Sequence, residues 1–432
     1  MSTRDQIRAH ILSAMVLGSF LFMLFISNHC FASDPDPSVQ KHIEKFKNLE
    51  ITENNGVKYF DKAKFWKKEG IHIAYLEGDP FEMGYQQGRL LKEFISINVK
   101  NSKSQIEKLG NSEALRKITK NIEKALPPAF IEEIKGIGVG SEVSYDDILR
   151  HNVWSILSAL KKQYLCSNFA AFNEATVDQK IIHFNTLDWE WVPSFGVLLI
   201  RRPSAGNGFV TFSEAGLIQA TGSGLNEKGI SVGHTGIHDT AKEYYSDEGI
   251  GKFLLLRKIL QYASSIEDVQ KILSTDKVME PCNYLVVDGK VKEAKVFEVT
   301  SKGFKLRTRE KNFLGLTNHF SLWRDWGRKD ESKERLKFLE NFYKENYGKI
   351  DLNKTVTLVR EGRIAKIFPQ YGIVTLVMML FTPENLDFWI AEAKEENVPA
   401  SWGPIVGFNL LKELGKGDKQ LPDPMTFPPG KE

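Results

Sequence analysis

The spacing of apolar side chains divides this chain into two regions of different texture. From about Ser38 to Leu165 the apolar positions mostly recur every three or four residues, which predicts a largely helical region. Ile71–Leu76 is the exception, because apolar and polar residues alternate there as in a strand, before a turn at Glu77–Pro80. Helices are predicted at residues 41–49, 84–98 and 127–136, and a further one to about residue 160 follows a capping box at Ser144–Asp147.

A glycine-rich stretch, G-I-G-V-G at residues 136–140, ends the third of these helical segments. Glycine-rich loops that bind dinucleotides follow a strand and open a helix. Here the glycines follow a helical pattern instead, so we interpret them as a C-cap and a turn. We therefore expect no nucleotide cofactor, and nothing else in the sequence indicates a cofactor.

After Cys166 the pattern changes to short β-rich segments separated by turn residues. Strands are predicted at residues 167–172, 180–184, 197–201, 209–212, 230–234, 284–287, 294–300, 304–308 and 312–316. Helices are predicted at residues 251–263, 266–273 (behind a Ser265 cap), 332–347 and 353–361. The charge run Arg324–Arg335 is interpreted as a solvated loop that leads into a helix. Strands and helices in this order are typical of sheets covered by helices, so the predicted fold class is α+β.

Residues 1–32 are predicted to be a signal peptide rather than part of the fold. Two arginines precede an uncharged run at Ile11–Ile26, and small residues flank Phe31 in the sequence that ends at Ala32. The run is shorter than the roughly 20 residues that span a membrane, and an uncleaved signal anchor is the alternative. We expect cleavage near Ala32 and a secreted or periplasmic location.

Composition narrows the classes of function. The chain has 432 residues, 42% of them hydrophobic and 26% charged, which excludes a collagen, a disordered chain and a polytopic membrane protein. The net charge of +3 arises from 58 basic and 55 acidic residues without a basic cluster, so nucleic acid is not an expected partner. His234 and His238 lie in a strand-to-loop stretch without a third ligand, so no metal is expected.

Cys166 and Cys282 remain after the expected removal of the signal peptide. Exported proteins generally use cysteines in disulfides, so one bridge or two buried thiols are the plain interpretations. The alternative is a nucleophile. The alternating segment Cys166–Phe172 pairs naturally with Lys180–Asp188 across a turn, which brings Asp188 beside Cys166. A cut before Cys166 would add a free α-amino group with a pKa of about 8, which is able to act as a base on the thiol.

Several short motifs, each weak alone, occur in a specific order and spacing. They are GDPFEMGYQQG (residues 78–88), EEIKGIGVG (132–140), ATVD (175–178), LDW (187–189), GSGLNEKGISV (222–232), NYLVVD (283–288), TNHF (317–320) and SKERL (332–336). Together with Cys166, they resemble the isopenicillin N acyltransferase family of autoproteolytic N-terminal-nucleophile (Ntn) hydrolases. A more distant similarity is to acid ceramidase-like and phospholipase B-like proteins. The resemblance extends from about residue 71 to residue 339.

The resemblance implies a four-layer αββα sandwich and a precursor that cuts itself between Leu165 and Cys166. The Cys166 thiol would attack the Leu165 carbonyl, and hydrolysis of the thioester would leave Cys166 as the N-terminal nucleophile. Asp188 matches the family aspartate that orients the new amine. Asn318 matches the asparagine whose NH2 group helps to form the oxyanion hole, and such a donor lowers the barrier by about 3 kcal/mol. Arg335 falls where related enzymes have an arginine near the site.

The implied organisation is a signal peptide at residues 1–32, a helical propeptide at 33–165 and a catalytic chain at 166–432. The propeptide fragment is expected to remain bound non-covalently, because Ile71–Leu76 and the helices up to Leu160 share the core. The implied activity is hydrolysis of a linear amide, or transfer of its acyl group, on a small-molecule or lipid substrate. Water is the expected acceptor because acyl-CoA is scarce outside the cytoplasm.

Two departures from the family pattern bear on function. Leu165 stands where the family commonly has glycine, which affects the efficiency of self-cleavage. Asn185 stands three residues before Asp188, where related amidases have arginine or glutamine, which affects substrate preference. Trp189 is a candidate to line an apolar acyl pocket. The open alternatives are a phospholipase B-like ester hydrolase with the same nucleophile and a catalytically inactive binding protein. A papain-like protease is excluded, because no C-G-x-C-W signature surrounds Cys166.

Overall fold

The computed structural model describes residues 37–108, 112–161, 165–238, 240–308, 312–324, 330–361, 364–417 and 423–430. The predicted signal peptide at residues 1–32 lies outside this description. The chain divides into two units, Met1–Leu49 and Glu50–Glu432. The described part of the first contains the amphipathic helix α2 (Pro37–Phe46), and the second contains both β-sheets. None of the described helices is long and apolar enough to cross a membrane.

The larger sheet contains eleven strands in the described part of the chain, in the order β1-β2-β3-β4-β7-β8-β9-β10-β11-β12-β13. Neighbouring strands are antiparallel except for β4 and β7, which are parallel. The strands are β1 (Thr52–Asn54), β2 (Val57–Phe60), β3 (Ala63–Lys68), β4 (Ile71–Gly78), β7 (Gly196–Pro203), β8 (Phe209–Glu214), β9 (Ser223–Asn226), β10 (Ile230–Gly236), β11 (Cys282–Asp288), β12 (Glu293–Thr300) and β13 (Gly303–Thr308). Segments before and after Cys166 therefore share one sheet.

The smaller sheet has the order β14-β5-β6-β16-β17-β18, with β15 paired to β16 at its side. Its strands are β5 (Asn168–Ala171), β6 (Ile182–Glu190), β14 (Phe313–Leu316), β15 (Ile367–Phe368), β16 (Ile373–Thr382), β17 (Asp387–Glu392) and β18 (Val406–Asn409). Every pairing in this sheet is antiparallel.

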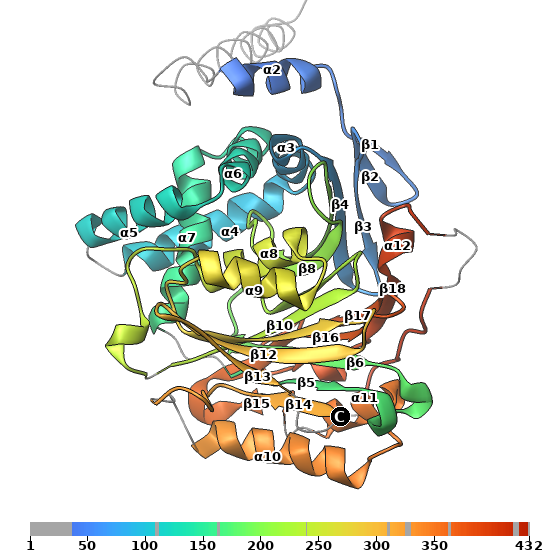
Figure 1. Cartoon of the computed structure of the whole chain (residues 1–432). Helices are drawn as coiled ribbons and strands as arrows, with labels where there is room; N and C mark the ends of the chain where they lie inside the picture. Colours follow the sequence, from blue (N-terminus) through green and yellow to red (C-terminus); the bar gives the residue numbers. More distant parts are fainter. Residues whose placement is uncertain are drawn as a thin grey trace, which may run out of the picture. The chain divides into compact units, whose positions relative to one another are not determined.

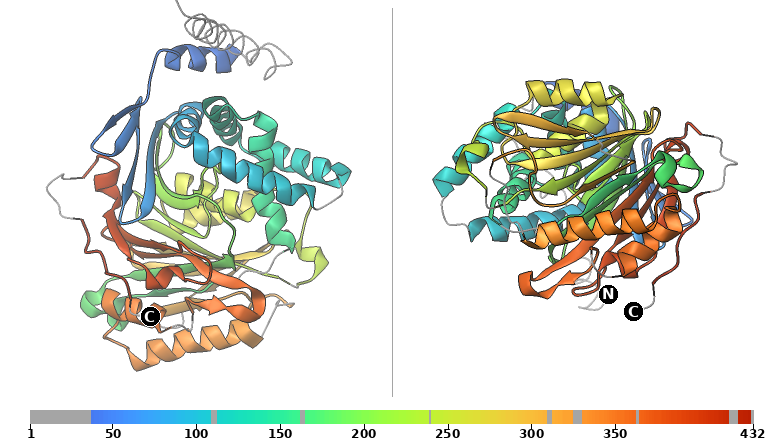
Figure 2. Two further views of the ribbon diagram at one scale, coloured as in Figure 1. Left: turned by 180° about the vertical axis from the view of Figure 1, so that it is seen from behind. Right: turned by 60° about the horizontal axis from the view of Figure 1, so that its bottom comes forward.

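Helices cover the outer face of each sheet, so the unit has four layers (Figure 1, Figure 2). The larger sheet is covered by α3 (Pro80–Leu90), α4 (Lys92–Glu107), α5 (Ser112–Ala125), α6 (Pro128–Ser141), α7 (Tyr145–Lys161), α8 (Lys252–Tyr262) and α9 (Ile266–Thr275). The smaller sheet is covered by α10 (Asp330–Glu345) and α11 (Leu352–Arg360), and the short helix α12 (Leu410–Glu413) follows β18. The predicted α+β sandwich is confirmed.

The core between the two sheets contains Cys166. This cluster combines Ile73 and Leu198 of the larger sheet with Val377 and Met379 of the smaller one. Side chains of β16 that point the other way pack against α10 and α11 in a second cluster. Burial on both faces explains why β16 is an almost continuous apolar run without the alternation that reveals a half-exposed strand.

The prediction that the glycines at residues 136–140 form a turn is wrong. Helix α6 continues through them and ends at Ser141, where Glu142 adopts a left-handed backbone with φ of 60°. The reason is packing against α3. A Cβ atom at Gly84, Gly88, Gly136 or Gly140 would lie 2.1–2.6 Å from a backbone atom of the opposite helix. The glycines therefore allow α3 and α6 to touch backbone to backbone.

The region predicted to be largely helical also contains strands that the sequence pattern did not indicate. Between α2 and α3, strands β1, β2 and β3 form an antiparallel meander that leads into β4. The helical prediction at residues 84–98 spans two helices, because α3 ends at Leu90 and α4 begins at Lys92. The Ser144 cap of α7 is present, since the Asp147 N–H donates to the Ser144 hydroxyl at 3.1 Å.

Candidate active site

Cys166 lies two residues before β5, at the start of the predicted hairpin between β5 and β6. The antiparallel register pairs Asn168 with Asn185. An isolated bridge extends the same ladder, because the Leu165 N–H donates to the Asp188 carbonyl oxygen at 3.0 Å. Cys166 is fully buried within the core between the sheets. The hairpin thus holds the peptide bond before Cys166 against the end of β6.

The main chain of Cys166 is fixed on both sides. Its N–H, which belongs to the Leu165–Cys166 peptide bond, donates to Asn318 Oδ1 at 2.7 Å. Its carbonyl oxygen accepts a hydrogen bond from Arg335 Nη1 at 2.5 Å. The next N–H, of Ser167, donates to the Thr186 hydroxyl at 2.9 Å. The main chain that carries the thiol is therefore held by β6, by α10 and by the residue Asn318 that follows β14.

Asn318 faces Cys166 through its carbonyl oxygen rather than through its NH2 group. Oδ1 accepts from both the Cys166 N–H and Arg335 Nη2, the latter at 2.9 Å. Nδ2 donates to the carbonyl oxygen of Gly236 at 2.8 Å. Two donors on one atom and an acceptor on the other fix the orientation of the amide. The oxyanion role of the NH2 group stays a prediction, since this group bonds to β10 while the chain is intact.

Arg335 belongs to the site rather than to a solvated charge run. Its side chain is only 4% exposed, and its guanidinium bonds to the Cys166 carbonyl, to Ser167 Oγ at 3.0 Å and to Asn318. Glu331, one turn earlier on α10, accepts from Arg335 Nε at 2.5 Å and from Nη2 at 3.0 Å. The prediction that residues 324–335 form a solvated stretch is wrong for Arg335, because the first turns of α10 lie against the site.

Two threonine hydroxyls hold the Asp188 carboxyl. Thr375 donates to Oδ1 at 2.7 Å and Thr186 to Oδ2 at 3.3 Å. Burial raises the pKa of Asp188 to about 8, although these hydroxyls and the charge of Arg335 oppose the rise. Burial, reinforced by the negative charge of Asp188, raises the pKa of the Cys166 thiol to about 12. At neutral pH the intact chain therefore holds a protonated thiol beside a largely protonated carboxyl.

Thr375 was not indicated by the sequence. It lies inside the apolar run of β16, opposite Asp188 in the β6–β16 ladder, and the register shifts between Thr375 and Val377. This bulge leaves Leu376 unpaired and places it in the wall of a cavity. A single threonine within an apolar strand does not by itself indicate a site residue. Its role becomes visible only from the register of β16 against β6, which places Thr375 opposite Asp188.

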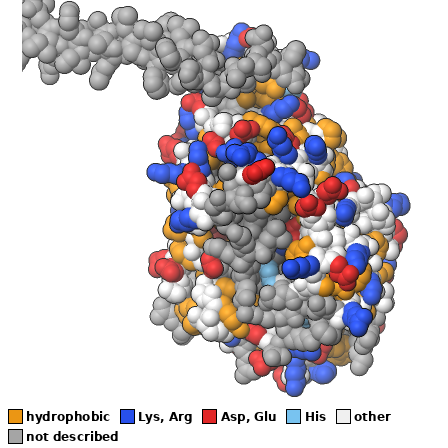
Figure 3. All heavy atoms as spheres, turned by 90° about the vertical axis from the view of Figure 1, so that its left-hand side faces the viewer, with side chains coloured by type: hydrophobic (Ala, Val, Ile, Leu, Met, Phe, Trp, Pro, Cys, Tyr) orange, Lys and Arg blue, Asp and Glu red, His pale blue; other side chains and the backbone are white. Residues whose placement is uncertain are grey.

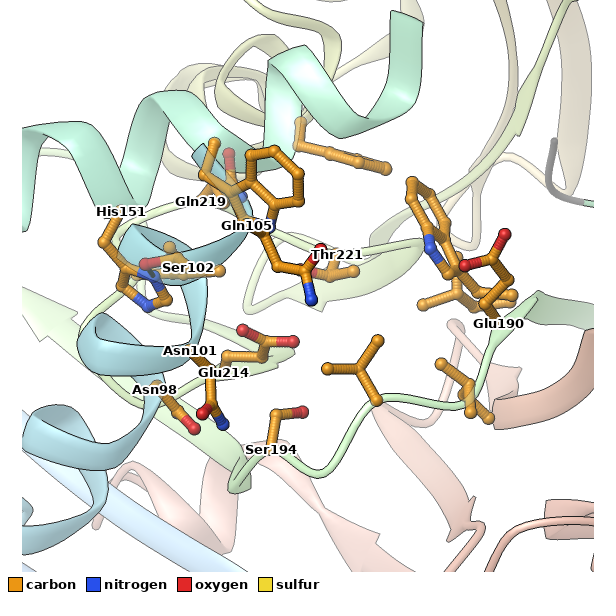
Figure 4. A pocket seen from close by; sticks show the side chains of 17 residues that line it. Asn98, Asn101, Ser102, Gln105, His151, Glu190, Ser194, Glu214, Gln219 and Thr221 are labelled. Atoms are coloured by element: carbon orange, nitrogen blue, oxygen red, sulfur yellow. Dashed lines mark hydrogen bonds between the residues drawn. The ribbon is translucent and has the colours of Figure 1, made fainter. Parts of the chain in front are cut away.

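A cavity of about 120 Å³ lies next to these residues (Figure 4). Leu187 and Leu376, neighbours of Asp188 and Thr375, form part of its wall, and the predicted pocket residue Trp189 lines it as well. Asn185 does not line the cavity. Its Nδ2 donates to the His234 carbonyl oxygen at 3.1 Å. Further lining residues come from α4 and α7, which precede Cys166 in the chain.

The two described cysteines are free thiols. Cys282 lies in β11 opposite Gly236 of β10, and it is fully buried, as Cys166 is. The single-disulfide interpretation is therefore wrong, and the two-thiol interpretation is correct.

The fold and site together define an α+β sandwich with a thiol, a carboxyl, an amide and a guanidinium gathered at one peptide bond. The chain belongs to the family described as acyl-coenzyme A:6-aminopenicillanic acid acyl-transferase, whose model matches residues 180–397. This confirms the resemblance inferred from the sequence motifs. The matched segment includes Asp188, Asn318, Arg335 and Thr375, and it begins after Cys166.

Similar proteins are distant in sequence. An uncharacterized protein of Archaeoglobus fulgidus is 27% identical over 374 residues, which cover 77% of this chain and 61% of that protein. Protein dcd1B of Dictyostelium discoideum is 27% identical over 242 residues, which cover 48% of this chain and 46% of that protein. The chain spans 46–61% of the length of the curated relatives it matches.

Solved structures with partial similarity include a mutant of conjugated bile acid hydrolase from Clostridium perfringens. It aligns with a TM-score of 0.43 at 12% identity, over 59% of this chain and 94% of that one. Penicillin V acylase from Agrobacterium tumefaciens aligns with a TM-score of 0.41 at 11% identity, over 57% and 87%. All of these scores lie below 0.5.

Proposed function

We propose that this protein is an exported amidohydrolase or acyltransferase whose chain cuts itself between Leu165 and Cys166. The observation that carries the proposal is the convergence of Asp188, Asn318 and Arg335 on the thiol and main chain of Cys166. Export is proposed from the apolar run at residues 11–26 and the small residues before position 33. Membership of an acyltransferase family supports chemistry on an acyl group.

In the proposed cut, Cys166 Sγ attacks the carbonyl carbon of Leu165. The thiol proton passes to the ionised Asp188 carboxylate, and the C–N bond breaks as the leaving nitrogen of Cys166 takes up this proton from Asp188. Leu165 is then held to Cys166 as a thioester. Water hydrolyses this thioester, which releases the Leu165 carboxylate and restores the thiol. The hydrogen bonds from Arg335 and to Asn318 support the step, because they hold Cys166 while the bond before it changes.

In the proposed turnover, the free amine of Cys166 acts as the base. It accepts the thiol proton as Sγ attacks the substrate carbonyl, and it returns a proton to the leaving amine. The acyl group then rests on Cys166 as a thioester until water, or an acceptor amine, removes it. Asp188 beside the amine stabilises its charged form, and Asn318 is the proposed oxyanion donor once the cut frees it to reorient.

We propose that the segment before Cys166 remains bound after the cut. Parallel pairing of β4 with β7 supports this, since it joins the two segments within one sheet. Polar contacts across the same boundary also support it. Asn98 Nδ2 donates to the Ala215 carbonyl oxygen at 3.1 Å, and the Gly216 N–H donates to Gln87 Oε1 at 2.8 Å. Separation of the fragments on a sizing column without denaturant would contradict the proposal.

Self-cleavage is expected to accelerate with rising pH. Asp188 must be ionised to accept the thiol proton, and its pKa in the intact chain is about 8. The ionised fraction, and with it the cutting rate, should rise about tenfold per pH unit below pH 8 and level off above it. The rate is measured on chain purified at low pH and then shifted upward. A rate independent of pH between 6 and 8 would remove Asp188 from the role of base.

Thr375→Val is expected to move this pH dependence upward. The lost hydroxyl stabilises the carboxylate at 2.7 Å, and a hydrogen bond to a charged group contributes about 1.5–3 kcal/mol. The midpoint should therefore rise by about one pH unit or more. Thr382→Val is the matched control, because Thr382 is a buried threonine of the same strand outside the site. Equal midpoints in both variants would contradict a positioning role for Thr375.

The experiment that tests the proposed function is intact mass analysis of the purified chain, followed by incubation with paired amides and esters of the same acyl groups. Two fragments that meet at Leu165–Cys166, amide turnover and an acyl group on the Cys166 fragment after acid quenching are expected. Turnover of esters alone would instead support the phospholipase B-like alternative. A single intact chain without turnover would leave the inactive binding protein and overturn the proposal.

A further inference from the structure

The cavity beside the site has an unusual charge composition. Its described lining side chains include the carboxyls of Glu190 and Glu214 and the indoles of Trp154 and Trp189, and no lysine or arginine is among them. The outer surface differs, because basic and acidic side chains are interspersed on the face drawn in Figure 3. The presence of acidic side chains without basic ones is therefore specific to the cavity and does not hold for the outer surface.

Glu214 is the group that gives the cavity its character. It is the last residue of β8, and Figure 4 shows its carboxyl reaching into the middle of the space, near Ser194 and Asn101. Burial raises the pKa of Glu214, and a hydrogen bond with Ser194 only partly opposes the rise. In the described part of the chain it has no ion pair. The Glu214 side chain is only partly buried. A carboxyl even partly removed from water without a counter-charge is costly, and a bound cation would offset that cost.

The polar groups around Glu214 do not supply the missing positive charge. Both polar atoms of the Asn98 side chain already have hydrogen-bond partners. Its Nδ2 donates to the carbonyl oxygens of Phe195 and Ala215, and its Oδ1 accepts from the Phe195 N–H. His151 is bonded to the Ser102 hydroxyl at 3.1 Å. Burial lowers the pKa of His151 to about 4, so its ring is neutral at pH 7. The acidic end of the cavity is thus lined by neutral partners.

The wall of the cavity also includes residues next to the candidate nucleophile site. Leu187 lies both in its wall and in the apolar cluster that contains Cys166. Leu376, beside Thr375 in the bulge of β16, lies in the wall near Asp188. The volume of about 120 Å³ suits a short chain rather than a long lipid tail. In the pose proposed below, the acyl carbon lies at Cys166 and the far end of the acyl group lies towards Glu214.

We propose that the substrate is an amide whose short acyl group ends in a protonated amine, held by Glu214 beside the indole faces of the cavity. This inference rests on the proposed function and specifies its substrate class. Attraction of a cation to a carboxylate and to aromatic faces is the chemistry that the lining offers.

The test compares three 4-nitroanilides of similar length: 5-aminopentanoyl, hexanoyl and glutaryl. The aminopentanoyl compound should have a kcat/KM about tenfold or more above that of the hexanoyl compound, and the glutaryl compound should be the poorest. In Glu214→Gln the ratio of aminopentanoyl to hexanoyl should fall at least about tenfold. Glu293→Gln, at a partly exposed position of β12 outside the cavity, is the matched control and should keep the wild-type ratio. A hexanoyl preference, or an unchanged ratio in Glu214→Gln, would overturn the inference.

A binding measurement separates failure of this inference from failure of the proposed function. Calorimetry with 5-aminopentanamide and with hexanamide, on wild type and on Glu214→Gln, needs no turnover. Tighter binding of the aminopentanamide, lost in Glu214→Gln, is expected whether or not the chain is cut. Equal or tighter binding of hexanamide overturns the cationic assignment while cutting and turnover remain intact. An uncut chain that turns over none of the anilides overturns the proposed function.

Discussion

Replacement of Cys166 by alanine is expected to leave the chain in one piece and to abolish acyl chemistry. The variant lacks the sulfur atom that we propose to attack the Leu165 carbonyl, while the Asn318 and Arg335 contacts to its main chain remain available. Loss of a catalytic nucleophile typically lowers kcat by at least about 10³-fold. A denaturing gel with intact mass measures the cut, and hydrolysis of the 4-nitroanilides measures the activity.

Cys282→Ala is the matched control for this prediction. Cys282 is also a fully buried free thiol, whose pKa burial likewise raises to about 12, but it lies in β11, opposite Gly236 of β10, rather than at the proposed cut. This variant should still yield both fragments. If Cys166→Ala were cut at the same place as the wild type, another group or an external protease would be responsible, and the nucleophile assignment would fall.

Glu133→Leu is expected to lower the free energy of unfolding by about 3–5 kcal/mol. Glu133, on α6, pairs with Arg201 of β7 at 3.3 Å and with Arg257 of α8, and all three side chains are buried. Burial already lowers the pKa of Arg201 to about 10, which reflects the cost of holding its charge inside. Without Glu133, two buried cations would lie close together with no counter-charge. The measurement is a shift of the urea midpoint, read by fluorescence and by circular dichroism.

The neighbouring Glu132→Gln provides the control. Glu132 pairs with Lys135 one turn away at the partly exposed surface of α6, so its loss should change the stability by less than about 1 kcal/mol. Because α6 precedes the proposed cut and both arginines follow it, Glu133→Leu should also release the fragments from each other at lower urea than the wild type. Equal stability of both variants would mean that hydrogen bonds to main-chain carbonyls are enough to stabilise the buried charges of Arg201 and Arg257.

The parts of the fold that the sequence predicted are those with a strong local signal. The hairpin of β5 and β6 followed from alternation and a turn, and the Ser265 cap marked α9, where the Asp268 N–H donates to the Ser265 hydroxyl at 3.2 Å. The strands β16, β17 and β18 were missed because their residues are buried on both faces or form short segments. The glycines of α6 were wrongly predicted to form a turn. They allow close contact with α3, and a contact between two helices cannot be predicted from the local sequence pattern.

In the candidate site, too, residues with a sequence motif could be predicted, whereas residues brought together only by the fold could not. Motif similarity pointed to Asp188, Asn318 and Arg335, and the structure gathers all three around Cys166. Thr375 and the α4 and α7 wall of the cavity depend on elements meeting in space, so the sequence carried almost no sign of them. Asn185 lies close to the LDW motif in the sequence, but its side chain bonds to the main chain of β10. The alternation of side chains along β6 determines the direction of the Asn185 side chain.

The wide separation along the chain of the groups around Cys166 has a consequence for the timing of biosynthesis. Asn318 and Arg335 follow Cys166 by 152 and 169 residues, and Thr375 follows Asp188 by 187. A ribosome that has just made Cys166 has produced none of these partners, and the parallel neighbour of β4 is also still missing. Contacts of such high sequence separation form late and slowly. Completion of the fold would therefore serve as the checkpoint for the cut, so that only a fully made and correctly folded molecule could acquire a free N-terminal cysteine.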